Sequence, residues 1–413
     1  MTAPRQGPRP LPLHLASAAM LWMSSRAALP LSKSGLLPWR PELAAAAKAL
    51  QQSLAAVAAE DLAAAVDVEL RARGDGFLNG VERYRHHSYR RALADPPVLW
   101  REGSTRLLDY RPEGGAPVLV VPSLINRAYI LDLAPGKSLM RFLAAQGMRP
   151  LLVDWGKPDA LERRFDLTDY IAGRLDAAGK AVAAAAGPFA VLGYCMGGLL
   201  ALALAARRPG LVQALALLAC PWDFHAERAG QARLLGQLME PLTAGWTALG
   251  EVPVDVLQML FAALDPMLAL RKFQRFAALP PASAEERDVV AVEDWLNDGV
   301  PLALPVAREC LGGWYGANTP GRGCWKVAGR PVLPERVAVP SLVVVPAQDR
   351  IVPPKTAAAL AESLPAAERL TPPLGHIGMM VAREAPAVVW RPLAHWLKRQ
   401  APARQRGGKG RRT

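Results

Sequence analysis

The sequence predicts an α/β fold with a mostly parallel sheet, covered on both faces, and an inserted, mainly helical cap. Short apolar runs alternate with helix-forming runs over residues 116–219, as strands and helices do in such a sheet. The strand pattern lapses after residue 221 and resumes at Ser341, an interval too long for a loop. We expect five regions: a helical extension at 1–95, a core at 96–223, the cap at 224–336, the rest of the core at 337–399 and a basic tail at 400–413.

The N-terminal extension is predicted to be helical. Residues 41–70 are rich in Ala and Leu, and the glycines within 74–79 predict a break after this helix. The apolar residues 11–23 follow two arginines and loosely imitate a secretory signal, but His14 interrupts them. We expect a packed or surface-associated helix there, and no segment has the uninterrupted apolar length of a membrane span.

The core elements follow in order along the chain. A hairpin is expected over 97–111, turning at Glu102 and Gly103. Strands are expected at 116–122, 150–155, 189–192, 211–219 and 341–346, and helices at 138–146, 167–186, 199–208 and 385–399. The cap contributes tryptophans that either line an apolar channel or form the cap's own core: Trp222, Trp246, Trp295, Trp314 and Trp325.

Residues 193–198 are the most informative segment of the chain. They read GYCMGG and join an apolar, strand-like run to a helix-forming run. This is the strand–turn–helix setting of a nucleophile elbow, with Cys195 where the G-x-S-x-G motif has Ser. At the start of a helix, the dipole and the free N–H groups favour a thiolate and a developing oxyanion. The alternative is a strand–glycine–helix junction that buries an inert cysteine.

Two further residues complete a candidate triad. Asp349 follows the predicted strand 341–346, and His376 lies in a Gly-flanked loop before the last predicted helix. The order Cys195, Asp349, His376 matches nucleophile, acid and base. In such a triad the His takes the thiol proton, and the Asp fixes the tautomer and stabilises the imidazolium. The alternative for Asp349 is a helix cap for a helix that starts near Pro354.

Composition agrees with a globular enzyme of 413 residues, of which 51% are hydrophobic. The four cysteines have neither metal-ligand spacing nor the density of a disulfide scaffold, so we expect no metal and a reducing cytoplasm. The net charge is +13, and residues 398–413 supply seven Lys or Arg with no acid. We expect this tail to be solvated. Contact with nucleic acid, an anionic surface or CoA phosphates is the alternative, and we expect no specific nucleic-acid partner.

Several motifs together resemble the polyhydroxyalkanoate synthase family, which has the α/β-hydrolase fold. The likeness runs from about Tyr84 to the last helix. Besides the Cys195 elbow, it rests on VPSLINRAYILDL at 121–133 with SL at 138–139, DWGKP at 154–158, DYI at 169–171, DRIVP at 349–353 and GHIG at 375–378.

The resemblance implies that a hydroxyacyl-CoA acylates Cys195 and that His376 acts as general base. It also implies a role for Asp349 in activating the 3-hydroxyl of the next monomer. The N–H of Met196 is expected to be one oxyanion donor, and a second is expected near Ile125. No chemistry is expected of Asp132, which matches a family Asp; a structural hydrogen bond is expected instead.

The resemblance implies a cytoplasmic acyltransferase that needs no cofactor and takes a CoA thioester as substrate. A homodimer and contact with a polyester granule are compatible with it. The alternatives are a Cys-dependent esterase, thioesterase or polymer depolymerase, and a non-catalytic granule-associated scaffold. The cap segments 293–301 and 312–325 do not clearly match the synthase cap, so the choice between polymerase and hydrolase stays open.

Overall fold

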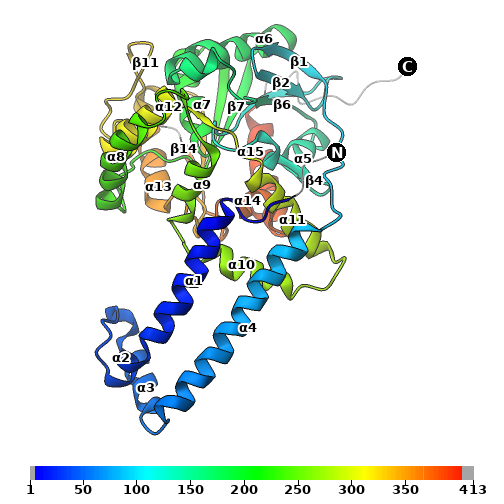
Figure 1. Cartoon of the computed structure of the whole chain (residues 1–413). Coiled ribbons are helices and arrows are strands. Elements are labelled where there is room, and N and C mark those ends of the chain that lie inside the picture. Colours follow the sequence, from blue (N-terminus) through cyan, green and yellow to red (C-terminus); the bar gives the residue numbers. More distant parts are fainter. Residues whose placement is uncertain (1–4, 366, 402–413) are drawn as a thin grey trace. The chain divides into compact units, whose positions relative to one another are not determined.

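A computed structural model describes residues 5–365 and 367–401 of the chain (Figure 1). The chain divides into two compact units, which are described separately below. The helical unit comprises residues 1–90 and 258–297, and the sheet unit comprises residues 91–257 and 298–413. The expected cap, 224–336, is therefore divided, because its central residues 258–297 belong to the helical unit.

The sheet unit is built on an eight-stranded sheet of order β1-β2-β6-β3-β7-β8-β13-β14. The hairpin β1–β2 is antiparallel and pairs Glu102 with Thr105, which confirms the predicted turn. Strand β2 pairs antiparallel with β6, and the remaining six strands are parallel. The strands are β1 (Val98–Glu102), β2 (Thr105–Asp109), β3 (Ala116–Val121), β6 (Met148–Asp154), β7 (Phe189–Tyr194), β8 (Val212–Leu218), β13 (Ser341–Val344) and β14 (Ala367–Leu370).

Both faces of this sheet are covered. The central strands β3, β7 and β8 carry runs of consecutive buried residues, and successive side chains of a strand point to opposite faces. The helices that pack against the strands are α5 (Leu139–Ala145), α6 (Asp176–Ala186), α7 (Met196–Arg207), α13 (Pro354–Ser363) and α15 (Arg391–Gln400). The predicted α/β fold with a mostly parallel sheet is confirmed.

The segments between β8 and β13 are mainly helical. Within the sheet unit, α8 packs against η5, and a Cβ on Gly236 would lie 2.5 Å from Gly316 Cα. The elements are α8 (Ala229–Ala244), α9 (Val254–Ala262), which crosses between the units, α12 (Leu304–Arg308) and the helical turn η5 (Glu309–Gly316), with the small antiparallel pairs β9 (Glu251–Val252) with β10 (Leu302–Ala303) and β11 (Lys326–Val327) with β12 (Arg330–Pro331).

The remaining elements of the sheet unit are short. They are β4 (Asp132–Ala134), β5 (Lys137–Ser138), α14 (Gly378–Val381) and the helical turns η2 (Ala128–Leu131), η3 (Glu162–Arg164), η4 (Asp169–Leu175), η6 (Pro334–Arg336) and η7 (Pro386–Trp390). Strand β14 has no alternating apolar pattern, with its middle residues Glu368 and Arg369 exposed, and the sequence analysis missed it.

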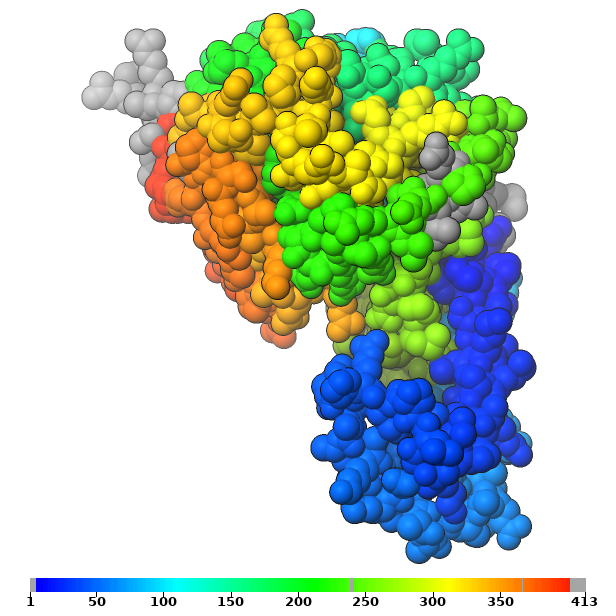
Figure 2. All heavy atoms as spheres, turned by 90° about the vertical axis from the view of Figure 1, so that its left-hand side faces the viewer, coloured from blue at the N-terminus to red at the C-terminus, as the bar shows by residue number. Residues whose placement is uncertain are grey.

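The helical unit contains α1 (Leu11–Ala27), α2 (Leu29–Ser34), η1 (Pro41–Leu43), α3 (Ala44–Leu54), α4 (Ala59–Arg85), α10 (Leu268–Ala277) and α11 (Ala284–Asn297). Its core joins the end of α4 to α10, where the Phe273 ring meets Phe77 and Tyr84 edge to face. Figure 2 shows the surface of α1, α2 and α3 in blue. On α1, Met20 is 69% exposed and Met23 is 70% exposed.

Two predictions for this unit were wrong. The helix expected over 41–70 is divided at residues 55–58 into α3 and α4, and the break expected over 74–79 lies inside α4. Two glycines of α4, Gly74 and Gly80, serve close packing instead. A Cβ on Gly74 would lie 3.0 Å from the Trp22 ring, and one on Gly80 would lie 2.0 Å from the Phe273 carbonyl oxygen. The apolar segment 11–23 lies within helix α1, as expected.

No helix among residues 5–365 and 367–401 is long and apolar enough to cross a membrane. Most of the predicted basic tail, residues 402–413, lies outside the described residues. At the end of α15, just before this tail, Lys398 Nζ donates to Gln146 Oε1 at 2.9 Å, and Arg399 pairs with Glu368 at 2.6 Å.

Candidate active site

Cys195 lies in the sharp turn between β7 and α7. Its φ of 57° and ψ of −130° are rare for a residue with a side chain, and such strain persists only where the surroundings impose it. Its N–H donates to the carbonyl of Leu218 on the neighbouring strand at 2.9 Å, and its carbonyl accepts from Gly198 at 2.9 Å. As a residue, Cys195 is half-buried, and it lies at the carboxyl edge of the sheet.

The glycines of the GYCMGG segment are required by close packing. A Cβ on Gly193 would lie 2.5 Å from Gly198 Cα, and a Cβ on Gly197 would lie 2.2 Å from the Val121 carbonyl oxygen. A Cβ on Gly198 would lie 2.5 Å from the sulfur of Cys220. Because no side chain fits at these positions, α7 begins directly against β3 and β8.

Asp349 lies in the loop after β13, and its carboxylate is buried with both oxygens bonded. Oδ1 accepts the N–H groups of Ile351 at 2.9 Å and Val352 at 2.8 Å. Oδ2 accepts Nδ1 of His376 at 2.7 Å. Helix α13 has no side-chain cap, so the alternative in which Asp349 caps that helix does not occur.

His376 lies in the loop between β14 and α14 and is 7% exposed. Burial lowers the pKa of its ring. The charge of Cys195, hydrogen bonds with Asp349 and Cys195, and the charge of Asp349 outweigh burial and raise this pKa to about 10. The structure thus brings the three predicted residues together, with His376 between the thiol and the carboxylate. The arrangement favours a protonated His376 ring beside Cys195 at neutral pH.

The two predicted oxyanion donors differ in their surroundings. Met196 is the first residue of α7, where main-chain N–H groups lack partners within the helix. The N–H of Ile125 donates to the side-chain oxygen of Ser123 at 3.0 Å. In this arrangement the Ile125 donor is occupied. The N–H of Leu124, one residue earlier in the same loop, has no such bond among the described residues.

Two tyrosines near the thiol were not found by the sequence analysis. Burial and the charges of Cys195 and Asp349 raise the pKa of Tyr194. Burial and the charges of Cys195 and Cys310 raise the pKa of Tyr315 in η5. The sequence could have pointed to Tyr194, since it directly precedes the nucleophile. It could not have pointed to Tyr315, because the position of that residue depends on the tertiary packing of residues 309–316.

The tryptophans of the sheet unit are mostly structural. Trp314 and Trp325 pack edge to face with ring centroids 5.3 Å apart, and both are buried. Trp222 is also buried, whereas Trp246 is half-buried. Trp295 belongs to the helical unit, where it is buried. For Trp314 and Trp325 the packing therefore agrees with a core role better than with a channel lining.

Asp132 has the structural role expected for it. Its fully buried carboxylate accepts Nε of Arg141 at 2.8 Å, a nitrogen of Arg91 at 3.1 Å and the hydroxyl of Tyr110 at 3.1 Å. This cluster fixes the segment after β3. Among the described residues, no group of three or more His, Cys, Asp or Glu side chains is placed to hold a metal ion.

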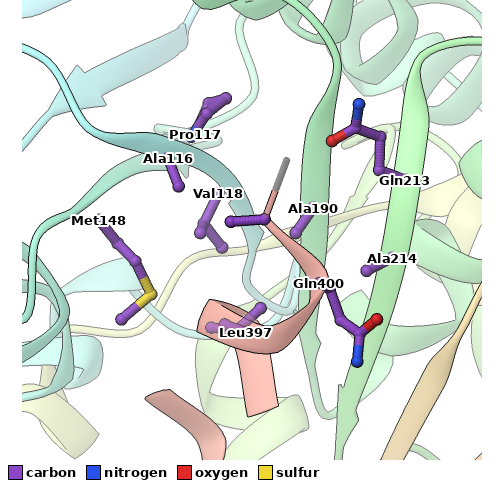
Figure 3. Close-up of a pocket in the computed structure, with 10 residues that line it drawn as sticks. Ala116, Pro117, Val118, Met148, Ala190, Gln213, Ala214, Leu397 and Gln400 are labelled. Carbon is purple, nitrogen blue, oxygen red and sulfur yellow. The ribbon is translucent and has the colours of Figure 1, made fainter. Parts of the chain in front are cut away.

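Figure 3 shows a pocket at the opposite edge of the sheet, where β3, β6, β7 and β8 begin. Met148, Ala190 and Gln213 line it together with Leu397 and Gln400 of α15. Parallel α/β sheets bind their ligands at the carboxyl ends of the strands, where Cys195, Asp349 and His376 lie. The pocket is therefore separate from the candidate active site.

Two protein families match the sequence. The family described as the alpha/beta hydrolase fold matches residues 183–382, which include the three candidate residues. The family described as the N-terminus of poly-beta-hydroxybutyrate polymerase (PhaC) matches residues 90–143, which include Asp132 and Ile125, one of the two expected oxyanion donors. The first match, with the observed strand order, identifies the α/β-hydrolase fold predicted from the sequence.

Two curated relatives of the chain are both named as polymerase subunits. "Poly(3-hydroxyalkanoate) polymerase subunit PhaC" of Haloferax mediterranei is 29% identical over 308 residues, covering 72% of this chain and 63% of the relative. The protein of the same name from Allochromatium vinosum is 29% identical over 299 residues, covering 70% of this chain and 83% of the relative. The chain thus spans less than two thirds of the length of the Haloferax relative.

Solved structures resemble the chain more distantly. An "Alpha/beta hydrolase fold protein from Nakamurella multipartita" is 19% identical with a TM-score of 0.44, covering 71% of this chain and 95% of that one.

Proposed function

We propose that this chain belongs to the polyhydroxyalkanoate synthase family and is an acyltransferase that builds a polyester from 3-hydroxyacyl-CoA and releases CoA. One observation carries the proposal: His376 lies between the thiol of Cys195 and the buried carboxylate of Asp349. That arrangement can activate a thiol and then a hydroxyl in succession. In this scheme the side chains supply all the chemistry, so no cofactor is required.

The first half of the cycle is acylation of Cys195. The thiolate sulfur attacks the acyl carbon of hydroxyacyl-CoA, and the bond from that carbon to the CoA sulfur breaks. The CoA thiolate then takes the proton of the His376 imidazolium. Met196 N–H donates to the oxyanion of the tetrahedral intermediate, and Leu124 N–H is the second donor we favour. Exchange of one thioester for another is nearly balanced in free energy, so the acyl group stays activated.

The second half is transfer to the next monomer. Neutral His376 takes the proton of the 3-hydroxyl of a second hydroxyacyl-CoA, and the hydroxyl oxygen attacks the acyl carbon on Cys195. The carbon–sulfur bond breaks, and the thiolate–imidazolium pair forms again. The extended chain, now a CoA thioester, acylates Cys195 and releases one CoA for each monomer added.

The burial of Asp349 favours an indirect role in both halves. The resemblance implies that this carboxylate activates the incoming hydroxyl itself. Its side chain, however, has no exposed surface, and its oxygens already accept three hydrogen bonds. We therefore propose that Asp349 acts through His376, by holding Nδ1 and stabilising the imidazolium.

The second candidate function is hydrolysis, and the partial exposure of Cys195 favours it. Water that reaches the acyl-enzyme takes the place of the 3-hydroxyl, and the product is then a free hydroxy acid. In either case we place the reaction in the cytoplasm. Because of the proposed family membership, three interactions should be tested: binding to a second copy of the chain, to a partner subunit and to the surface of a polyester granule.

The partition of acyl groups separates the two functions. Purified chain is incubated with 3-hydroxybutyryl-CoA, and released CoA, free 3-hydroxybutyrate and insoluble polyester are measured by chromatography. We expect CoA release to match the monomer found in polymer. Cys195→Ala is the control that should release no CoA. If free acid alone appears, with and without candidate partner subunits, the polymerase proposal fails and the hydrolase remains.

A further inference from the structure

The main-chain carbonyl of His376 has an unusual partner. On either side of it, the carbonyls of Gly375 and Ile377 accept N–H groups from the turn that starts α14, namely those of Met379, Met380 and Val381. The carbonyl of His376 instead accepts the phenolic hydroxyl of Tyr194 at 3.2 Å. A side chain from β7 therefore supplies the donor that fixes this point of the loop.

The same side chain also contacts the imidazole. The ring centroids of Tyr194 and His376 lie 5.1 Å apart, and the ring planes are tilted by 31°. Tyr194 is 4% exposed, so both contacts are shielded from water. An aromatic face next to an imidazolium is attractive because the ring's negative face meets a cation. Tyr194 thus holds both the main chain and the side chain of His376.

We propose that Tyr194 is a positioning residue that keeps His376 aligned between Cys195 and Asp349. Tyr194 and Cys195 are adjacent in the chain, so the anchor of the base is joined to the nucleophile by a single peptide bond. Any displacement of the loop after β14 relative to the elbow must break the Tyr194 hydrogen bond. The inference rests on the proposed pairing of Cys195 with His376, but not on whether the acyl group goes to a hydroxyl or to water.

The test is the pH profile of thiol alkylation, which needs no substrate. The rate of carbamidomethylation of Cys195 by iodoacetamide is measured between pH 5 and 10 in a Cys324→Ala background. That background removes the exposed thiol, while Cys220 and Cys310 are buried. Tyr194→Phe keeps the ring and removes the hydroxyl, and Tyr194→Leu removes both contacts.

We expect the rise of the alkylation rate to move to higher pH by about half a unit in Tyr194→Phe, the size of one lost neutral hydrogen bond, and further in Tyr194→Leu. Acylation by 3-hydroxybutyryl-CoA should slow by about three- to ten-fold in Tyr194→Phe. If Tyr194→Phe does not fold, Tyr194→Met, which also lacks both the ring and the hydroxyl, is measured with the expectation given for Tyr194→Leu.

Tyr110→Phe is the matched control. It also removes a phenolic hydroxyl that donates to a buried acceptor, Asp132, but it lies at the amino end of β6. It should lower stability and leave the alkylation profile unchanged. A folded Tyr194→Phe protein with a wild-type profile would overturn the proposal, and so would a lower melting temperature with no change in profile.

A double-mutant cycle separates this inference from the proposed function. In a His376→Ala background the substitution Tyr194→Phe should no longer change the alkylation profile, because its effect passes through the imidazole. An equal shift in both backgrounds contradicts the positioning role. If His376→Ala itself leaves the profile unchanged, the pairing of Cys195 with His376 is wrong, and the proposed function fails with it.

Discussion

His376 Nδ1 lies 2.7 Å from Asp349 Oδ2, although 27 positions separate the two residues in the chain. The parallel pairing of β13 with β14 accounts for this, since Asp349 follows β13 and His376 follows β14. The carboxyl ends of neighbouring parallel strands meet at one edge of a sheet, so two short loops suffice to bring acid and base together.

Replacing Asp349 by Asn should slow both halves of the proposed cycle to a similar extent. The change removes the charge that stabilises the imidazolium, and triad enzymes lose activity by about 10²-fold or more from such a change. Rapid-quench measurement of acylation and a separate assay of chain extension check this. Asp176→Asn is the control, since Asp176 is a buried carboxylate that pairs with Arg208 away from the thiol. A much larger loss in extension than in acylation would instead indicate direct contact with the hydroxyl.

Replacing Cys195 by Ala should abolish CoA release and covalent acyl capture, because no other side chain at the elbow can accept the acyl group. Mass spectrometry of the intact chain after incubation with the thioester checks the capture. Cys195→Ser should retain only slow hydrolysis, since a hydroxyl needs a stronger base than a thiol. Cys220→Ala, Cys310→Ala and Cys324→Ala should each keep activity, and substantial turnover by folded Cys195→Ala would refute the assignment.

The imidazole of His376 should titrate near pH 10 in the intact chain, above the usual histidine value of about 6.5. In Cys195→Ala the pKa of the His376 ring should fall far below its value in the intact chain. The replacement removes one attractive charge and one hydrogen bond, while burial still disfavours the cation. NMR titration of the ring nitrogens, with His376→Gln for assignment, measures both. An unchanged pKa in Cys195→Ala would contradict the thiolate–imidazolium pair.

The same shift has a consequence for stability. A group whose pKa is higher in the folded state than in the unfolded state stabilises the folded chain. The stabilisation is complete at pH values below the unfolded-state pKa, and it is lost as the pH rises through the folded-state pKa. The contribution of His376 should therefore be complete below about pH 6.5 and vanish by about pH 10. We expect the difference in unfolding free energy between wild type and His376→Gln to shrink across this window, measured by urea denaturation.

Two glycines of α4 should respond in opposite ways to Ala. A Cβ on Gly80 would lie 2.0 Å from the Phe273 carbonyl oxygen, so Gly80→Ala should destabilise the chain by about 2 kcal/mol or more. A Cβ on Gly76 would meet only Gln274 Cγ, at 3.7 Å. Gly76→Ala should stabilise by about 0.5–1 kcal/mol, because Ala loses less conformational freedom in a helix. Equal effects in thermal unfolding would contradict the packing of α4 on α10.

The elbow and the order of the triad were readable from the sequence because each depends on local pattern. Cys195 is marked by its neighbouring glycines, Asp349 follows the predicted strand 341–346, and His376 is marked by the glycines beside it and by the predicted helix that follows. Contacts between residues that lie far apart in the sequence cannot be predicted from local pattern. The contact of Gly198 with Cys220 and that of Tyr194 with His376 join residues whose approach depends on the register of neighbouring strands.

The errors in the helical extension have a similar cause. Glycines within 74–79 predict a break when only the helix itself is considered, since glycine weakens an isolated helix. In the folded unit Gly74 lies against the Trp22 ring, and this close contact compensates for the lost propensity at that position, whereas Gly76 has no such contact. Gly80 packs against Phe273, and no pattern in the sequence predicts that Phe273 contacts α4.

The core of the helical unit also constrains when it can form during synthesis. Phe77 and Tyr84 leave the ribosome long before Phe273, which follows Tyr84 by about 190 residues. At roughly 5–20 residues per second, α4 waits about 10–40 s for the aromatic ring that completes its core. Over that interval six of the eight strands of the sheet can already assemble, whereas the part of α4 that Phe273 covers stays exposed. The newly made chain should therefore depend on a holding chaperone at its N-terminal helices, and that dependence should end once residues 268–277 have emerged.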